Sequence, residues 1–109
     1  MKRKDKILND ISRVARRLFG NGNGGYVYLY GSQARADANA NSDWDLIIIT
    51  DDSPVYDDNE AFIRYAFPFA EIGWHYGAQI TPIHFTRSQW DAQRGTAFFI
   101  NVTSEAIRL

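Results

Sequence analysis

The strongest constraint on the fold is an unbroken run of four apolar residues, Leu46 to Ile49, near the middle of the chain. A strand with one solvent-exposed face alternates apolar and polar residues, whereas a continuous apolar run is typical of a strand that is buried on both faces. Such a strand is covered by helices on each side of its sheet. We therefore expect Trp44 to Thr50 to be a central strand.

Two longer helices are predicted, one before and one after this strand. The first shows apolar residues at steps of four, three and four, which is the period of one buried helical stripe, and Gly20 is well placed to end it. The second opens at Asp57, with Glu60 as a capping acid three residues later, and we expect Pro68 to kink it. The stripe residues are Ile7, Ile11, Val14 and Leu18 in the first helix and Phe62, Ala66, Phe69, Ile72 and Gly73 in the second.

Further strands and short helices complete the pattern. An aromatic strand is expected at 26–30 after the glycine-rich turn 20–25, a second strand at 79–85, and a short last strand at 106–109. Pro82 cannot donate to a ladder, so it favours either an edge position for the 79–85 strand or a locally irregular pairing. A capping box of Thr86 and Gln89 opens one short helix, and 97–102 forms another helical turn. The predicted fold class is α/β (α+β), with one mixed sheet of about four strands and helices packed on it.

Composition narrows the class of protein. The 109 residues, 45% hydrophobic and 15% aromatic, suit a single domain spanning 1–109 with an ordinary core. The formal net charge of −1 gives no general attraction to nucleic acid or to an anionic membrane. There is no cysteine, and no apolar run is long enough for a signal peptide or a membrane span. We therefore expect a cytoplasmic protein with no membrane partner, and nucleic acid is a less favoured partner.

The residues best suited to hold a phosphate follow the first strand. Gly31 allows the backbone to turn tightly and to approach a ligand closely. Ser32 adds a hydroxyl beside the backbone N–H groups of a helix expected to start there. Arg35 lies one helical turn further on, where it either reaches the same anion or pairs with Asp37 or Asp43.

Two acids open the central strand. Asp43 and Asp45 are separated by one residue, so strand alternation places both carboxylates on one face, close enough to share a cation. Mg²⁺ prefers oxygen ligands and commonly binds one or two carboxylates together with substrate phosphates and waters. An isolated Asp-x-Asp is more often a solvated strand entrance, but Gly-Ser eleven residues earlier favours a metal site.

This segment resembles the minimal nucleotidyltransferases, which belong to the nucleotidyltransferase superfamily of the DNA polymerase beta type. Their pattern is Gly-Ser-x-Ala-Arg-Gly-x-Ala followed by Ser-Asp-x-Asp-Leu. The chain matches it at nine positions and has Ala36 where the family usually has glycine. The matching residues are Gly31, Ser32, Ala34, Arg35, Ala38, Ser42, Asp43, Asp45 and Leu46.

The resemblance implies a catalytic function. Members of this family transfer a nucleoside monophosphate from a nucleoside triphosphate to a hydroxyl, with pyrophosphate as the leaving group. By analogy, Gly31 and Ser32 would grip the triphosphate, ATP being the expected one, and Asp43 and Asp45 would be the catalytic and Mg²⁺-binding carboxylates. Complete members usually carry a third acid on the strand that corresponds to 79–85, and Thr81 takes its place here. Glu71 or Asp91 would have to substitute for it, although both fit exposed helical acids better.

Two functions therefore remain open. The first is an active enzyme that modifies a protein, a small molecule or a nucleic acid terminus. The second is a catalytically weakened nucleotide-binding module that acts through a partner protein, since minimal nucleotidyltransferases are known as antitoxin halves of toxin–antitoxin pairs. His75 and His84 lie on different predicted elements, so we assign them structural roles.

Overall fold

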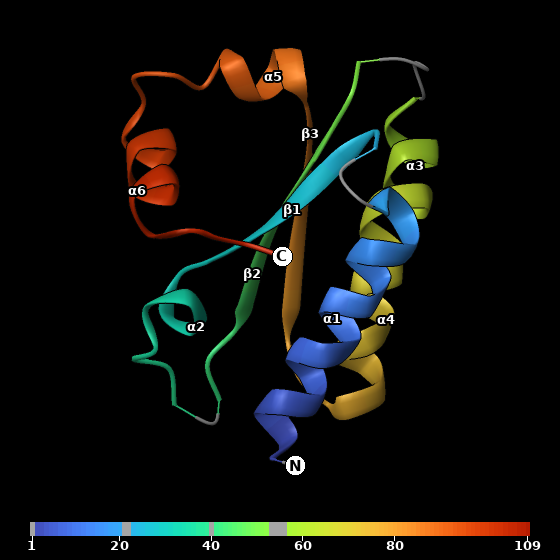
Figure 1. The fold of residues 1–109 in the computed structure, drawn as a ribbon, viewed down its shortest axis with the longest axis vertical. Helices are drawn as coiled ribbons and strands as arrows, with labels where there is room; N and C mark the ends of the chain where they lie inside the picture. The colour runs from blue at the N-terminus through green and yellow to red at the C-terminus, as the bar shows by residue number, and fades with distance from the viewer. Residues whose placement is uncertain (1, 21–22, 40, 53–56) are drawn as a thin grey trace.

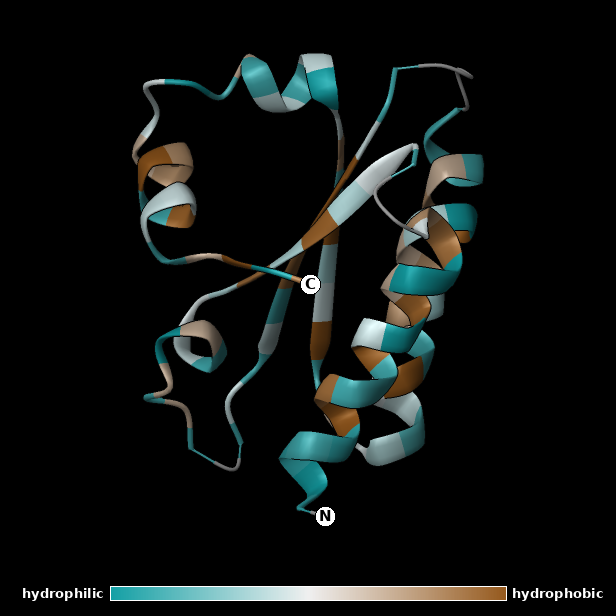
Figure 2. Cartoon of the chain, in the orientation of Figure 1, coloured by the Kyte–Doolittle hydropathy of each residue, from teal (hydrophilic) through white to brown (hydrophobic). Residues whose placement is uncertain are grey.

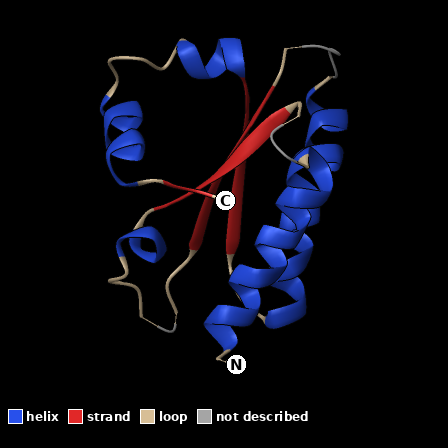
Figure 3. Cartoon of the chain, viewed as in Figure 1, coloured by secondary structure: helices blue, strands red, loops and turns tan. Residues whose placement is uncertain are grey.

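The computed structural model describes residues 2–20, 23–39, 41–52 and 57–109, and its elements follow the predicted order closely (Figures 1 and 3). The predicted turn at 20–25 lies partly outside the described residues. Four strands and the helices around them make up the described chain. In order they are α1 (Arg3–Phe19), β1 (Gly25–Tyr30), α2 (Ser32–Arg35), β2 (Trp44–Thr50), α3 (Asp58–Ala61), the π-helical η1 (Phe62–Ala66), α4 (Phe67–Tyr76), β3 (Ile80–Thr86), α5 (Arg87–Asp91), α6 (Ala97–Glu105) and β4 (Ile107–Arg108).

The four strands form one mixed sheet in the order β3-β2-β1-β4. Strand β1 is antiparallel to both β2 and β4, whereas β2 and β3 are parallel. The predicted mixed sheet of about four strands is therefore confirmed. Strand β3 lies at an edge, which is the first of the two alternatives for Pro82, because a residue without an N–H is tolerated where one side of the strand has no neighbour.

Strand β2 is buried on both faces, as its apolar run predicted. The side chains of Ile47 and Ile49 pack with Trp90 and Val102 of α5 and α6, while Leu46 and Ile48 pack against α1 and α4 on the opposite face. All four β2 residues are 0% exposed. Figure 2 shows apolar segments on the sides of α1 and α4 that approach the sheet. The sheet is thus a central layer with helices on both sides (Figure 1).

The buried stripe of α1 differs in part from the predicted one. Ile7 and Ile11 are fully buried, but the line continues through Ala15 and Phe19, with Val14 and Leu18 only partly buried beside it. These four positions follow the i, i+4 row of the helix. The Phe19 ring stacks on Tyr65 at a centroid distance of 6.0 Å, which fixes that row against η1. Gly20 ends the helix as predicted, with φ at +53°.

The chain remains helical through α3, η1 and α4, with a π-helical turn rather than a break before Pro68. Asp57 caps this segment as predicted, accepting a hydrogen bond from the Glu60 N–H at 2.8 Å. Proline cannot donate an N–H, and its ring collides with the carbonyl four residues earlier in a regular α-helix, so a wider π turn relieves the conflict. The wider turn also shifts the side chains. Phe62, expected in the buried stripe, is 48% exposed, and Ala61 is buried in its place. The other predicted stripe residues, Ala66, Phe69, Ile72 and Gly73, are buried as expected.

His84 has a structural role on the face of the sheet that packs against α1 and α4. Its Nε2 atom lies 2.8 Å from the Thr50 hydroxyl, and its ring stacks on Tyr65 at 5.1 Å. Burial lowers the pKa of His84 below its ordinary value. No helix in the described ranges is long and apolar enough to cross a membrane.

We expect the free energy of unfolding to decrease as the pH falls from about 7.5 to about 5. The unfolded chain protonates His84 more readily than the folded chain does, so stability present above its ordinary pKa is lost as the pH falls through the lower folded value. His84→Gln should reduce this pH dependence, and His75→Gln, at an exposed position of α4, should keep it. Urea unfolding across this range is the measurement. Equal pH dependence in wild type and His84→Gln would contradict the assignment.

Candidate active site

Gly31 forms the turn that brings the first strand against the acidic pair. Tyr30 at the end of β1 pairs with Asp45 at the start of β2, so Gly31 lies directly beside that carboxylate. Its φ of +77° and ψ of −158° fall in a region that essentially only glycine adopts. A Cβ atom added to Gly31 would lie 2.6 Å from Asp45 Oδ2. The missing side chain therefore permits close contact between the turn and the carboxylate.

The short helix α2 begins immediately after this turn. The Gly31 carbonyl accepts hydrogen bonds from the N–H groups of Ala34 and Arg35, both at 3.1 Å. Ser32 is half-buried at the first position of the helix, and Gln33 is buried with one donor bound to the Ser42 carbonyl at 3.3 Å. These contacts hold Gly31 and Ser32 next to the entrance of β2, as their position in the sequence predicted.

The two carboxylates lie at the entrance of β2. Asp45 is half-buried in β2 and shares the face of Ile47, while Asp43 is exposed just before the strand, close enough for its charge to act on Asp45. Burial raises the pKa of Asp45, and the negative charges of Asp43 and Glu105 raise it further against the opposing effect of Arg35. The site thus carries negative charge that a cation would neutralise.

These residues fit Mg²⁺ only as a partial set of ligands. No group of three or more His, Cys, Asp or Glu side chains that could hold a metal occurs among the described residues. A hard cation at Asp43 and Asp45 would therefore complete its shell with waters and with oxygens of a bound phosphate chain, which is the usual pattern for Mg²⁺. The two carboxylates supply the charge that this arrangement requires.

Arg35 lies beside the turn and makes two ion pairs. Its Nε atom donates to Asp37 Oδ2 at 3.1 Å, one of the predicted alternatives, and its second pair is with Glu105 Oε2 at 3.0 Å. Glu105 ends α6, and its other oxygen accepts the Gly31 N–H at 3.1 Å. Sequence reasoning did not identify Glu105 because no local pattern joins it to the motif. Its single acidic charge near the end of the chain carries no recognisable spacing signal.

Tyr30 is a second neighbour of the site that the sequence did not reveal. Its side chain lies on the same face as Asp45, where its ring packs edge-on against Phe98 at 6.0 Å. Burial raises the pKa of its hydroxyl, and the charges of Asp45 and Glu105 raise it further. The hydroxyl therefore remains protonated at neutral pH and is available as a hydrogen-bond donor. The aromatic pattern at 26–30 predicted a strand and gave no sign that Tyr30 lies beside the acids.

The position of the expected third acid is occupied by Thr81. Thr81 pairs with Asp45 in the parallel β2–β3 ladder, on the same face of the sheet. The two substitutes considered from the sequence lie elsewhere. Asp91 ends α5, which follows β3 at the end of that strand opposite Thr81, and it pairs with Arg94. Glu71 is exposed on α4, on the other side of the sheet. Thr81, with a neutral hydroxyl, is thus the β3 residue in register with Asp45.

Ala36 ends α2 in a left-handed conformation, with φ at +63° and ψ at 24°. Among the described residues it is the only non-glycine residue with a positive φ. A side chain is strained there because its Cβ approaches the following carbonyl oxygen. The family's usual glycine at this position is therefore explained by the backbone of the turn.

We expect Ala36→Gly to raise the free energy of unfolding by about 1 kcal/mol, because it removes this strain. The matched change Ala34→Gly, inside α2, should lower it by about 1 kcal/mol, because glycine loses more backbone entropy in a helix. Urea unfolding of both variants is the measurement. A loss of stability in both would show that the turn is unstrained.

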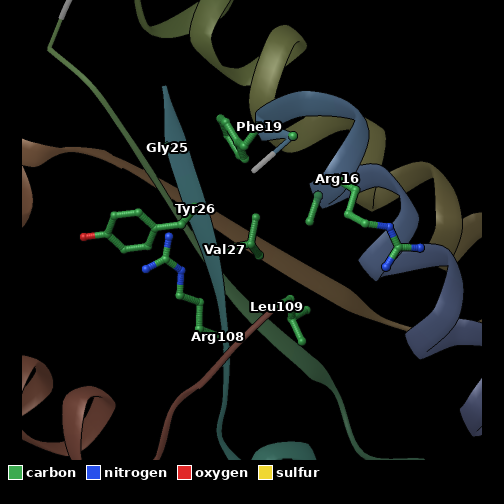
Figure 4. Close-up of a pocket in the computed structure, with 9 residues that line it drawn as sticks. Arg16, Phe19, Gly25, Tyr26, Val27, Arg108 and Leu109 are labelled. Carbon is green, nitrogen blue, oxygen red and sulfur yellow. The ribbon is translucent and has the colours of Figure 1, made fainter. Parts of the chain in front are cut away.

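A small cavity lies between α1 and the strands β1 and β4, away from the carboxylates (Figure 4). Its volume is about 40 Å³, and Arg16, Phe19, Tyr26 and Arg108 contribute to its walls. Figure 4 shows the Arg108 side chain next to the Tyr26 ring, over which its guanidinium lies at 4.7 Å. Small-molecule sites occupy roughly 300–1,000 Å³, so this cavity is too small for a nucleotide.

Comparisons with known proteins identify the family and the fold. A family model described as "Polymerase beta, Nucleotidyltransferase" matches residues 15–93, which include Gly31, Ser32, Asp43 and Asp45. A solved structure described as the crystal structure of a toxin–antitoxin with AMP-PNP superposes with a TM-score of 0.57. It is 15% identical, with 92% of this chain and 69% of that chain covered, which shows a common fold. No curated protein matches significantly. Because the family model covers well over half of its length, the chain belongs to the polymerase beta nucleotidyltransferase family.

Proposed function

We propose that this chain is a Mg²⁺-dependent nucleotidyltransferase that transfers a nucleoside monophosphate from a nucleoside triphosphate, ATP in the first instance, to an acceptor hydroxyl. The observation that carries the proposal is the contact between the Gly31 turn and Asp45, with Asp43 close by. This contact brings the turn that would bind phosphate next to the carboxylates that would bind a cation, where β1 ends and β2 begins. A location in the reducing cytoplasm, where nucleotides are available, suits a chain without cysteine.

The residues divide the chemistry between them. The Gly31–Ser32 turn and Arg35 would hold the phosphate chain, and Asp43 and Asp45 would hold Mg²⁺, which would neutralise charge on the phosphates. In the overall reaction, the acceptor oxygen forms a bond to the α-phosphorus, the bond to the bridging oxygen breaks, and pyrophosphate leaves. The hydroxyl proton passes to a base. Positioning and charge neutralisation are the contributions that these side chains can make.

Nucleotide binding can be tested directly by NMR. Mg²⁺-ATP should shift the backbone amides of Gly31, Ser32 and Asp45, while the amides of α5 at the far end of the sheet should stay in place. Mg²⁺ with adenosine should leave all of them unshifted, because it lacks the phosphates. If the three amides do not move at millimolar Mg²⁺-ATP, the proposed function is wrong.

A second function follows from Thr81. Without a carboxylate at this position, the chain lacks the group that usually helps to activate the nucleophile in its family, and a neutral hydroxyl is a poorer metal ligand. Under this alternative, the chain is a nucleotide-binding module of antitoxin type that acts through a partner protein. The solved toxin–antitoxin with AMP-PNP has a similar fold, which supports looking for a protein partner, either as acceptor or as toxin. Transfer of label from α-³²P-ATP to such a partner separates the enzyme from the binding module.

We expect Thr81→Asp to raise Mg²⁺-dependent transfer at least about tenfold, since a well-placed acid–base group contributes more than that in many enzymes. The residue in register with Asp45 would then be an acid, as in complete members of the family. Thr81→Asn is the matched control, because it has nearly the same size as aspartate and no charge. Rates are measured as label transfer from α-³²P-ATP. An aspartate variant no faster than the asparagine variant would show that the missing acid does not limit the reaction.

A further inference from the structure

Glu105 contacts the same groups that the proposed function assigns to a phosphate. Its Oε1 atom accepts the Gly31 N–H at 3.1 Å, and its Oε2 atom accepts from Arg35 at 3.0 Å. One carboxylate therefore spans the backbone donor of the turn and the guanidinium beside it. Both donors suit any anion with oxygens at this spacing, whether a carboxylate or a phosphate.

The surroundings of Glu105 are otherwise unfavourable for a negative charge. Its side chain is only 23% exposed, and its charge contributes to the raised pKa values of Asp45 and of Tyr30. Asp43 and Asp45 already place two carboxylates at this site. Within the described ranges, the printed side-chain hydrogen bonds to Glu105 come from the Gly31 N–H and Arg35, and Arg35 is shared with Asp37. A polyphosphate that brings Mg²⁺ would neutralise the charges of Asp43 and Asp45, whereas the Glu105 carboxylate adds to them.

We propose that the Glu105 carboxylate occupies the anion-binding site formed by the Gly31 N–H and Arg35, here called the anion seat. A polyphosphate would then bind to these two donors only by displacing this carboxylate. The seat is the anion-binding part of the site, and the identification of the displacing ligand as a nucleoside triphosphate rests on the proposed function. Glu105 thereby lowers the affinity for the nucleotide, because each binding event has to break the two hydrogen bonds of its carboxylate.

The position of Glu105 couples this exchange to the end of the chain. Glu105 is the last residue of α6, and β4 follows at Ile107–Arg108, paired with β1 at Tyr28 and Leu29. The Ala106 N–H closes the helix by donating to the Val102 carbonyl at 2.8 Å. Release of the carboxylate is therefore expected to alter the Glu105 and Ala106 amides, although neither belongs to the Gly31–Asp45 motif.

Calorimetric titration with two probes, Mg²⁺-ATP and inorganic tripolyphosphate, tests the proposal. Glu105→Gln keeps the shape of the side chain and an acceptor oxygen for the Gly31 N–H but removes the charge, and Glu105→Ala removes both. We expect both variants to bind both probes about tenfold more tightly, the equivalent of about 1.4 kcal/mol. Glu71→Gln, which removes an exposed acid on α4 across the sheet, should bind as wild type does. In wild-type protein, the Glu105 side-chain ¹³C carboxyl resonance should shift on addition of either probe.

Each outcome has a distinct meaning. Equal or weaker binding by a folded Glu105→Gln variant, with wild-type binding measurable, overturns the role of Glu105 and leaves the proposed function intact. Tighter binding of tripolyphosphate by the Glu105 variants, with Mg²⁺-ATP bound no better than tripolyphosphate, supports the proposed role of Glu105 and counts against the nucleotide function. If neither probe binds to any variant, the anion seat does not exist and both proposals are wrong.

Discussion

Asp45→Asn is expected to reduce Mg²⁺-dependent transfer from a nucleoside triphosphate by about 100-fold or more, the scale seen when an electrostatic group at a transition state is removed. Asparagine keeps the size of the side chain but loses the charge that would hold Mg²⁺ beside the Gly31 turn. Label transfer from α-³²P-ATP in Mg²⁺ measures the rate. Asp91→Asn, at the opposite end of the sheet, should leave the rate unchanged.

The same substitution should not destabilise the fold. Burial and the neighbouring charges of Asp43 and Glu105 disfavour the ionised form of Asp45, as its raised pKa indicates. A neutral amide removes that repulsion, so Asp45→Asn should unfold at the same urea concentration as wild type or at a higher one. Lost activity together with retained stability identifies a residue kept for its chemistry. Full activity in Asp45→Asn would exclude it from the catalytic site.

Gly31→Ala is expected to abolish Mg²⁺-ATP binding and to lower the free energy of unfolding by about 1–3 kcal/mol, the cost of a backbone conformation that side chains avoid. The added Cβ would lie 2.6 Å from Asp45 Oδ2, so either the turn or the carboxylate has to move. Calorimetry with Mg²⁺-ATP and urea unfolding measure the two effects.

Gly77→Ala is the matched control for this change. Gly77 also has a positive φ, +66°, at the end of α4, but a Cβ there has no neighbour within 4 Å. This variant should lose some stability through backbone strain and keep nucleotide binding unchanged. If both glycine variants bind Mg²⁺-ATP as wild type does, the close approach of Gly31 to Asp45 has no role in binding.

Much of the fold was predictable because its signals are local. The apolar run in β2, the capping box at Thr86 and Gln89, and the edge position of Pro82 each depend on a few adjacent residues, and each prediction is confirmed. The π-helical turn was not predicted. Proline indicates a disturbance in a helix, but by itself it does not distinguish a kink, a break and a wider turn.

The sequence by itself determined the short-range part of the site. Spacing alone placed Gly31 and Ser32 after one strand and Asp43 and Asp45 at the start of the next, and the β1–β2 pairing brings them together. Only the tertiary structure decided that Glu105, 74 residues from Gly31, binds the same turn and Arg35. The reason is physical. Strand and turn patterns follow from neighbouring residues, whereas the contact of Glu105 depends on how α6 and β4 pack against β1, which no local pattern encodes.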